Sequence, residues 1–325
     1  MKCKLVLVAG LAAIAAGITP FANAQTGNYP NQTIRLVVGW TAGGATDILA
    51  RHLAVHMGRQ LQQSVVVDNR PGAVGTIAHG EVSRAKPDGY TLILATNSTY
   101  AIAPHLIRTL PYGAGALAPI SLVGMSPLIL TVAPPLNVQD VKGLLALVRR
   151  QPGRLNYSSG GNGSTSHLAT ELFKDQTRTS ITHIPYRGGG PATLAVAAGE
   201  VELGFVDIGV AMPLIQAGRL KPIAVSGSTR SPNLPQVPTV EEEGVPRFES
   251  ATKFALFAPA GTPAMVIERL NEAVRSANGN EELKDRLRMQ GIELVASSPA
   301  ALGKDMTEGL AKWGRLIAER KLSLE

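Results

Sequence analysis

Short apolar runs alternate with helix-type periodic segments along most of the chain. Residues 34–38 are apolar and β-branched, and in the segment after them Leu49, Leu53, Met57 and Leu61 recur at intervals of four. This spacing lines one face of a helix. Further strand-type runs are found at 65–67, 90–95, 155–157, 181–185, 201–206, 220–225 and 252–258. The alternation predicts an α/β fold of mostly parallel sheets flanked by helices.

The order of these segments also predicts two lobes. The apolar run 122–133 contains Pro127, which favours either an edge strand or a bent crossing. If the chain crosses there and returns later, residues 25–127 and 254–325 form one lobe and residues 128–253 form an inserted lobe. Ligands bind between such lobes, at the carboxyl ends of the strands.

Three glycine-rich turns each join a predicted strand to a predicted helix, at residues 39–47, 158–167 and 186–191. The first N–H groups of a helix lack intrahelical partners and lie at its positive end, so such a turn binds an anion without a lysine. Three turns that converge on one cleft would hold a small molecule that bears a carboxylate. The spacing matches neither the dinucleotide fingerprint nor the phosphate-binding loop.

The first residues have the pattern of an export signal. Lys2 and Lys4 precede the apolar run 5–18, and residues 22–24 (Ala-Asn-Ala) form a small-x-small cleavage site. We expect cleavage after residue 24 and a mature periplasmic chain without a transmembrane segment. A membrane anchor is less favoured, because the run is shorter than the ~20 residues of a span. The single cysteine, Cys3, lies in this segment, which leaves the mature chain without a disulfide.

Composition excludes several function classes. The formal charge is +7, but the basic residues are scattered and aromatic residues make up 4% of the chain, so no nucleic-acid partner is expected. His52 and His56 lack the glutamate of a zinc-protease motif, and no metal or cofactor is predicted. Ser164 and His167 raise the alternative of an exported hydrolase, but the nucleophile elbow G-x-S-x-G is absent. No catalytic residue is assigned, and Ser164 is expected to be a helix cap or a ligand donor.

Several short motifs, taken in their order along the whole chain, resemble the periplasmic solute-binding proteins of tripartite tricarboxylate transporters, also called Bug receptors. The matching segments are 29–30 with 34–47, 68–73, 86–92, 156–168, 185–188, 217–220, 234–239 and 258–263. The resemblance implies a two-lobed, Venus-flytrap fold of the type II periplasmic class. It implies a receptor that binds a small carboxylated solute and delivers it to membrane permease subunits. A monomer is the default expectation, since the sequence does not fix the oligomeric state. A ligand sensor for a sensor kinase is the alternative with the same fold.

The resemblance also implies which residues bind the ligand. They are Trp40, Thr41, Ala42, Gly43, Gly44, Thr46, Asp47, Asn97, Ser98, Ser158, Gly163, Ser164, His167, Tyr186, Arg187, Gly188 and Asp207. Arg187 would suit a carboxylate, and Asp207 a helix cap or a water-mediated contact. The family commonly has Phe-Asp-Asn where this chain has Phe-Val-Asp at 205–207. The acidic group that would bind the amino group of a ligand is therefore displaced or absent, which argues against an amino acid as ligand.

Overall fold

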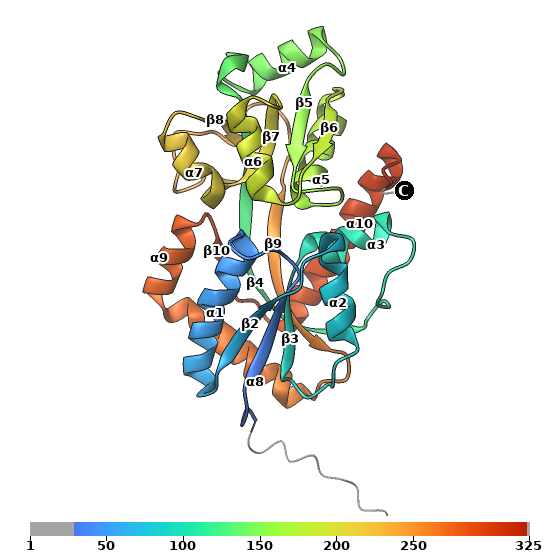
Figure 1. Ribbon diagram of the computed structural model, residues 1–325, viewed down its shortest axis with the longest axis vertical. Helices are drawn as coiled ribbons and strands as arrows, with labels where there is room; N and C mark the ends of the chain where they lie inside the picture. Colours follow the sequence, from blue (N-terminus) through green and yellow to red (C-terminus); the bar gives the residue numbers. More distant parts are fainter. Residues whose placement is uncertain (1–28, 324–325) are drawn as a thin grey trace, which may run out of the picture.

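The computed structural model describes residues 29–323, and the predicted signal segment lies outside them. Two lobes are stacked along the long axis of the molecule, each a sheet covered by helices (Figure 1). The N-terminal part of the lower lobe comprises β1 (Ile34–Val38), α1 (Ala45–Leu61), β2 (Val65–Asn69), the 3-10 turn η2 (Ala73–Gly75), α2 (Thr76–Ser83), β3 (Thr91–Thr96), the π-turn η3 (Ser98–Ile102) and α3 (Ala103–Leu106). β1 lies between β2 and β3 and pairs in parallel with both.

Burial explains why these βα units are firm supports. Leu36 and Leu92 on the strands and Leu49 and Met57 on α1 are all inaccessible to solvent and belong to one core cluster. Each such side chain contributes roughly 1.5–3 kcal/mol when it is fully buried. The carboxyl ends of β1 and β3 are therefore fixed relative to the start of α1.

Two long strands join the lobes. β4 (Leu117–Val132) pairs antiparallel with β9 (Ala251–Pro259) over residues 117–127, and its remaining residues pair with strands of the upper lobe. Pro127 is the last of the residues that pair with β9. Of the two possibilities that the sequence offers for this run, the structure has the crossing.

The upper lobe repeats the βα pattern. It comprises η4 (Pro134–Leu136), α4 (Val141–Arg150), β5 (Asn156–Ser159), α5 (Thr165–Thr177), β6 (Thr182–Pro185), α6 (Gly189–Ala198), β7 (Leu203–Asp207), α7 (Ile208–Gln216) and β8 (Lys221–Val225). β5 pairs in parallel with β6 and β7, whereas β7 and β8 pair antiparallel with β4. The α/β fold is as predicted. β4 joins the sheets of the two lobes into one ten-stranded sheet, which is mixed because β4 and β9 run antiparallel to their neighbours.

The C-terminal segment covers the lower lobe and then reaches the upper one. It comprises α8 (Ala264–Arg275), η5 (Ser276–Gly279), α9 (Glu281–Met289), β10 (Glu293–Leu294) and α10 (Pro299–Arg320). α10 rises beside α3 towards α5 (Figure 1). Leu168 of α5 shares a core cluster with Trp313 and Ile317 of α10, so the two lobes are packed together at this point.

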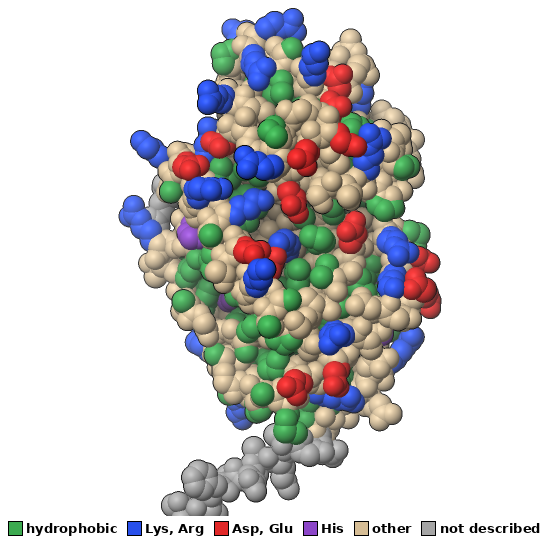
Figure 2. Space-filling model, turned by 180° about the vertical axis from the view of Figure 1, so that it is seen from behind, with side chains coloured by type: hydrophobic (Ala, Val, Ile, Leu, Met, Phe, Trp, Pro, Cys, Tyr) green, Lys and Arg blue, Asp and Glu red, His purple; other side chains and the backbone are tan. Residues whose placement is uncertain are grey.

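The surface carries charges of both signs. Figure 2 shows acidic and basic side chains interspersed over both lobes on the rear face, with apolar side chains more frequent on the lower lobe. Within residues 29–323, no helix is long and apolar enough to cross a membrane. The same residues include no group of three or more histidine, cysteine or acidic side chains arranged to hold a metal ion.

Candidate ligand-binding cleft

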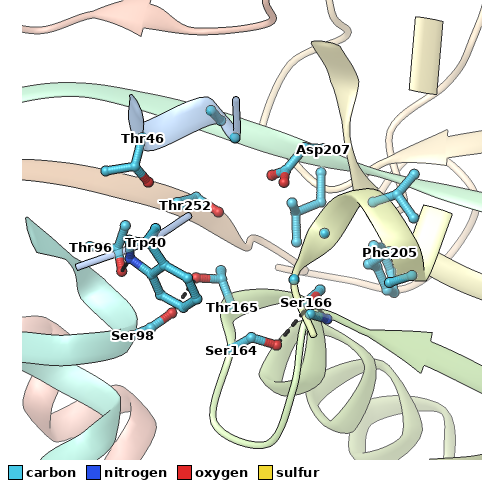
Figure 3. A pocket seen from close by; sticks show the side chains of 18 of the residues that line it. Trp40, Thr46, Thr96, Ser98, Ser164, Thr165, Ser166, Phe205, Asp207 and Thr252 are labelled. Atoms are coloured by element: carbon cyan, nitrogen blue, oxygen red, sulfur yellow. Dashed lines mark hydrogen bonds between the residues drawn. The ribbon is translucent and has the colours of Figure 1, made fainter. Parts of the chain in front are cut away.

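A cavity of about 100 Å³ lies between the lobes (Figure 3). Its walls are the carboxyl ends of parallel strands and the helix starts that follow them: Trp40 follows β1, Thr96 ends β3, Gly160 follows β5 and Asp207 ends β7. Leu128 of β4 and residues of β9 line it between the lobes. The cavity therefore lies where ligands bind in open α/β sheets.

The turn before α1 presents backbone donors to this cavity. Gly44 is the N-cap of α1 and no side chain caps the helix start, while Ala45 and Thr46 line the cavity. Gly43 has φ of +84°, a conformation that favours glycine, and this bend directs the chain into the helix. The first N–H groups of α1 have no intrahelical partners and are available to an anion.

Asp47 braces this turn from behind. Its carboxylate accepts hydrogen bonds from the Gly43 N–H at 2.9 Å, from Arg51 Nε at 2.9 Å and from Asn69 Nδ2 at 3.0 Å. Burial alone would raise the pKa of Asp47, but these donors outweigh it and lower the pKa. Asp47 does not line the cavity, so its place in the structure is that of a support for the turn.

Trp40 forms one wall of the cavity and is held at both ends. Its indole Nε1–H donates to Thr96 Oγ1 at 3.2 Å, and its carbonyl accepts from Asn69 Nδ2 at 3.0 Å. The indole ring is therefore held in a defined orientation at the cavity wall (Figure 3).

The start of α5 forms the opposite wall. Ser164 caps the helix, accepting the His167 N–H at 3.3 Å, and Ser166 Oγ accepts the Gly160 N–H at 3.0 Å. Ser164, Thr165 and Ser166 all line the cavity. Three hydroxyl groups thus accompany the helix start on this side.

His167 supports that loop from the interior of the upper lobe. Its Nδ1 accepts the Gly163 N–H at 3.0 Å, which requires a neutral ring, and it stacks on His183 with ring centroids 4.1 Å apart. Burial, with His183 nearby, lowers the pKa of His167 to about 3. The Ser164 hydroxyl lies 3.1 Å from Ser166 Oγ, and no hydrogen bond among the described residues joins it to an imidazole.

Hydrogen bonds cross between the lobes beside the cavity. The Thr165 hydroxyl donates to Asn97 Oδ1 at 3.1 Å and lies 3.0 Å from Ser98 Oγ. The amide of Asn97 also binds the β9 backbone, donating to the Ala251 carbonyl at 3.0 Å and accepting the Lys253 N–H at 3.2 Å. Asn97 of the lower lobe therefore bonds both the upper lobe, through Thr165, and the connecting strand β9.

The third glycine turn begins α6. Gly188, with φ of +109°, is its N-cap without a side-chain hydrogen bond, and Gly188 and Gly189 line the cavity. Arg187 is exposed and does not line it, and the Tyr186 hydroxyl donates to Glu200 Oε2 at 3.3 Å. This turn supplies the cavity with backbone groups.

Asp207 projects its carboxylate into the cavity from the end of β7 (Figure 3). It is the N-cap residue of α7, yet its side chain makes no capping hydrogen bond, so the expected cap is not formed. Burial raises the pKa of Asp207 to about 6. Of the two possibilities that the sequence leaves for the family's acidic residue, the structure has the displaced one. The acidic residue lies at position 207 instead of 206, and its carboxylate still reaches the cavity.

The structure brings about half of the residues predicted for ligand binding to the cavity. Those that line it are Trp40, Thr41, Gly44, Thr46, Ser98, Ser164, Gly188 and Asp207. Those that do not are Ala42, Gly43, Asp47, Asn97, Ser158, Gly163, His167, Tyr186 and Arg187. Ser158 is a buried residue of β5, and its hydroxyl faces Gly204.

Several lining residues are not in the predicted set. They are Ala45, Thr96, Leu128, Gly160, Thr165, Ser166, Gly189, Ala192, Phe205, Val206, Thr252 and Phe254. Thr165, Ser166 and Gly189 lie within the glycine turns and could have been found from them. Leu128 and Thr252 belong to the crossing strands, and nothing in their local sequence marks them.

The chemistry of the cavity follows from these walls. Helices α1, α5, α6 and α7 all begin at it, and hydroxyl groups of Thr46, Ser98 and Ser164 accompany them. No arginine, lysine or histidine is among the described residues that line it. An anion would therefore be held by helix starts and hydroxyl donors instead of by an ion pair.

A two-lobed α/β sandwich with such a cavity between its lobes is the architecture of a periplasmic solute-binding protein. Residues 49–322 match the family model described as "Tripartite tricarboxylate transporter family receptor". The chain belongs to this family.

Relatives and solved structures agree with this assignment. The chain is 33% identical to Protein BugT of Bordetella pertussis over 99% of each chain. It is similar to R. palustris Rpa4515, solved with adipate, at 36% identity and a TM-score of 0.84, with 89% of this chain and 97% of that one covered. MatC from Rhodopseudomonas palustris, solved with bound malate, is 30% identical with a TM-score of 0.81, covering 89% of this chain and 100% of that one. Two of the similar structures were thus solved with a carboxylate.

Proposed function

We propose that this protein is a periplasmic receptor that binds a small carboxylated solute between its lobes and delivers it to a tripartite tricarboxylate-type membrane transporter. The observation that carries the proposal is the meeting of four helix starts at one cavity that has no basic lining side chain. Helix starts attract carboxylates through unpaired N–H groups and the helix dipole. The adipate and malate in two related structures agree with this chemistry.

The proposal includes export and lobe organisation. A signal peptide of residues 1–24 would direct the chain to the periplasm. We assign residues 25–127 and 254–325 to one lobe and 128–253 to the other. This division is supported by β4, whose partner changes from β9 to β7 and β8 between Pro127 and Leu128.

Ligand binding would favour the closed arrangement of the lobes. A ligand shifts an open–closed equilibrium only by its difference in affinity for the two forms. Here α1 donors come from one lobe and α5 and α6 donors from the other, so a ligand that contacts both stabilises closure. A permease, or in the alternative a sensor kinase, would recognise that closed surface.

A thermal-shift screen tests the proposal. The chain from residue 25 onward is partly unfolded and refolded to remove bound solute, then heated with mono-, di- and tricarboxylates. A ligand at ~100 times its Kd stabilises the fold by about 2.7 kcal/mol, a rise of several degrees in Tm. A stabilising acid supports the receptor. No response to any acid, together with ester turnover that is lost in Ser164→Ala, would replace it with the hydrolase.

A further inference from the structure

Asp207 differs from the other residues that line the cavity because it is charged. It is the sole charged residue among the described residues that line the cavity, and its charge has the same sign as the proposed ligand. Asp207 lines the same cavity of about 100 Å³ that the ligand would occupy. Two carboxylates that share a site cannot both remain ionised without a cation or a proton between them.

No cation on the surrounding elements supplies that compensation. On α1, the first charged pair is Asp47 with Arg51, bound to each other behind the turn. On β9, Lys253 is paired with Asp305 and does not line the cavity. Arg187, before α6, is exposed. The α5 and β4 residues at the cavity, Ser164 to Ser166 and Leu128, are uncharged.

The carboxyl group of Asp207 is also free of partners in the described chain. It makes no capping bond to α7, and it faces Gly189, where an added Cβ would lie 2.8 Å from Oδ2. Burial raises the pKa of Asp207 to about 6, and no neighbouring charge contributes to this shift. Of the nearby imidazoles, His167 and His183 have pKa values lowered to about 3 and about 4 by burial, so they stay neutral near pH 7.

We propose that Asp207 selects the ligand by carrying a proton when an acid is bound, so that a carboxylate enters the cavity together with one proton from solvent. The protonated carboxyl can donate a hydrogen bond to the ligand, whereas the ionised form would repel it. The class of ligand is then an acid with no cationic group, such as a dicarboxylate. This inference rests on the proposed function.

Calorimetric titration of the refolded protein with adipate between pH 6.5 and pH 8.5 tests it. Unperturbed carboxyl groups are fully ionised across this range. If one proton is taken up with each bound ligand, the affinity for adipate falls by up to about tenfold for each unit by which the pH rises. Titrations in buffers with different heats of ionisation should show the uptake of close to one proton per ligand. Asp207→Asn should bind adipate with no pH dependence, and more tightly than the parent at pH 8.5.

The control is Asp285→Asn, which changes an exposed aspartate on α9 and should retain the pH dependence of the parent. Adipate binding that is flat with pH, without proton uptake, overturns the inference and leaves the receptor function intact. The inference is also overturned if the parent binds an ammonium-bearing acid such as aspartate more tightly than adipate and if this preference is lost in Asp207→Asn. If neither variant nor parent binds any acid at any pH, the proposed function itself fails.

Discussion

Asp207 destabilises the ligand-free fold at neutral pH, and the sign of this effect can be tested. A pKa that rises from 3.8 to about 6 on folding means that the folded chain binds more protons between these values. The contribution of the protonated Asp207 to the free energy of unfolding is therefore fully present below the unfolded pKa, and it is lost as the pH rises through the folded pKa. The loss above pH 6 is roughly 3 kcal/mol at most.

Asp207→Asn should remove this loss. Without ligand, we expect the Tm of the variant to match that of the parent at pH 4 and to exceed it by several degrees at pH 7.5. Differential scanning calorimetry at both pH values measures the difference. A variant that is less stable than the parent at pH 7.5 would mean that the Asp207 carboxylate makes a favourable contact in the fold.

Asn69 should matter to ligand binding without touching the cavity. Its amide donates to the Trp40 carbonyl and to Asp47, so it ties β2 to the turn before α1. Asn69→Ala leaves the buried Asp47 carboxylate short of a donor, at a cost of about 1–3 kcal/mol. We expect lower stability in urea and weaker acid binding, whereas Asn278→Ala, at an exposed position of η5, should change neither. Unaltered affinity in Asn69→Ala would show that the turn needs no such brace.

At the scale of elements, hydrophobic periodicity predicted the helices and strands well because each repeats a local pattern. The glycine turns marked α1, α5 and α6, since a bend into a helix needs a conformation that glycine adopts readily. The site was harder to predict. Phe205, Val206 and Asp207 at the end of β7 all line the cavity, and the sequence does not reveal that the acidic side chain reaches it from position 207. Leu128 and Thr252 reach the cavity only because β4 and β9 pair across a long separation in sequence.

Helix α5 should be a principal link between the lobes. Leu168 is completely buried in a cluster that contains Trp313 and Ile317 of α10. Leu168→Ala should lower the free energy of unfolding by about 2–5 kcal/mol, as loss of a buried leucine does. Urea denaturation measures it, with Leu194→Ala at an exposed position of α6 as the control. A loss below 1 kcal/mol would show that α5 and α10 are not tightly packed.

At the scale of the whole molecule, the links between the lobes include two strands, the α5–α10 contact and the hydroxyl of Thr165. This hydroxyl bonds Asn97 and lies beside Ser98 in the other lobe. Thr165→Val keeps the shape and removes the bonds. Small-angle scattering without ligand should then give a larger radius of gyration, and an unchanged radius would show that these bonds do not hold the lobes together.

The central claim is that helix starts bind the acid, and Gly44 allows its most direct test. This N-cap has φ of −81°, and an added Cβ would lie 3.6 Å from the Thr41 carbonyl, so a side chain fits. Aspartate and asparagine cap helices about equally well, but only aspartate adds a negative charge. Calorimetric titration with adipate and malate should show binding by the parent and by Gly44→Asn, and at least a tenfold weaker affinity in Gly44→Asp. Equal affinities in the two variants would contradict the account.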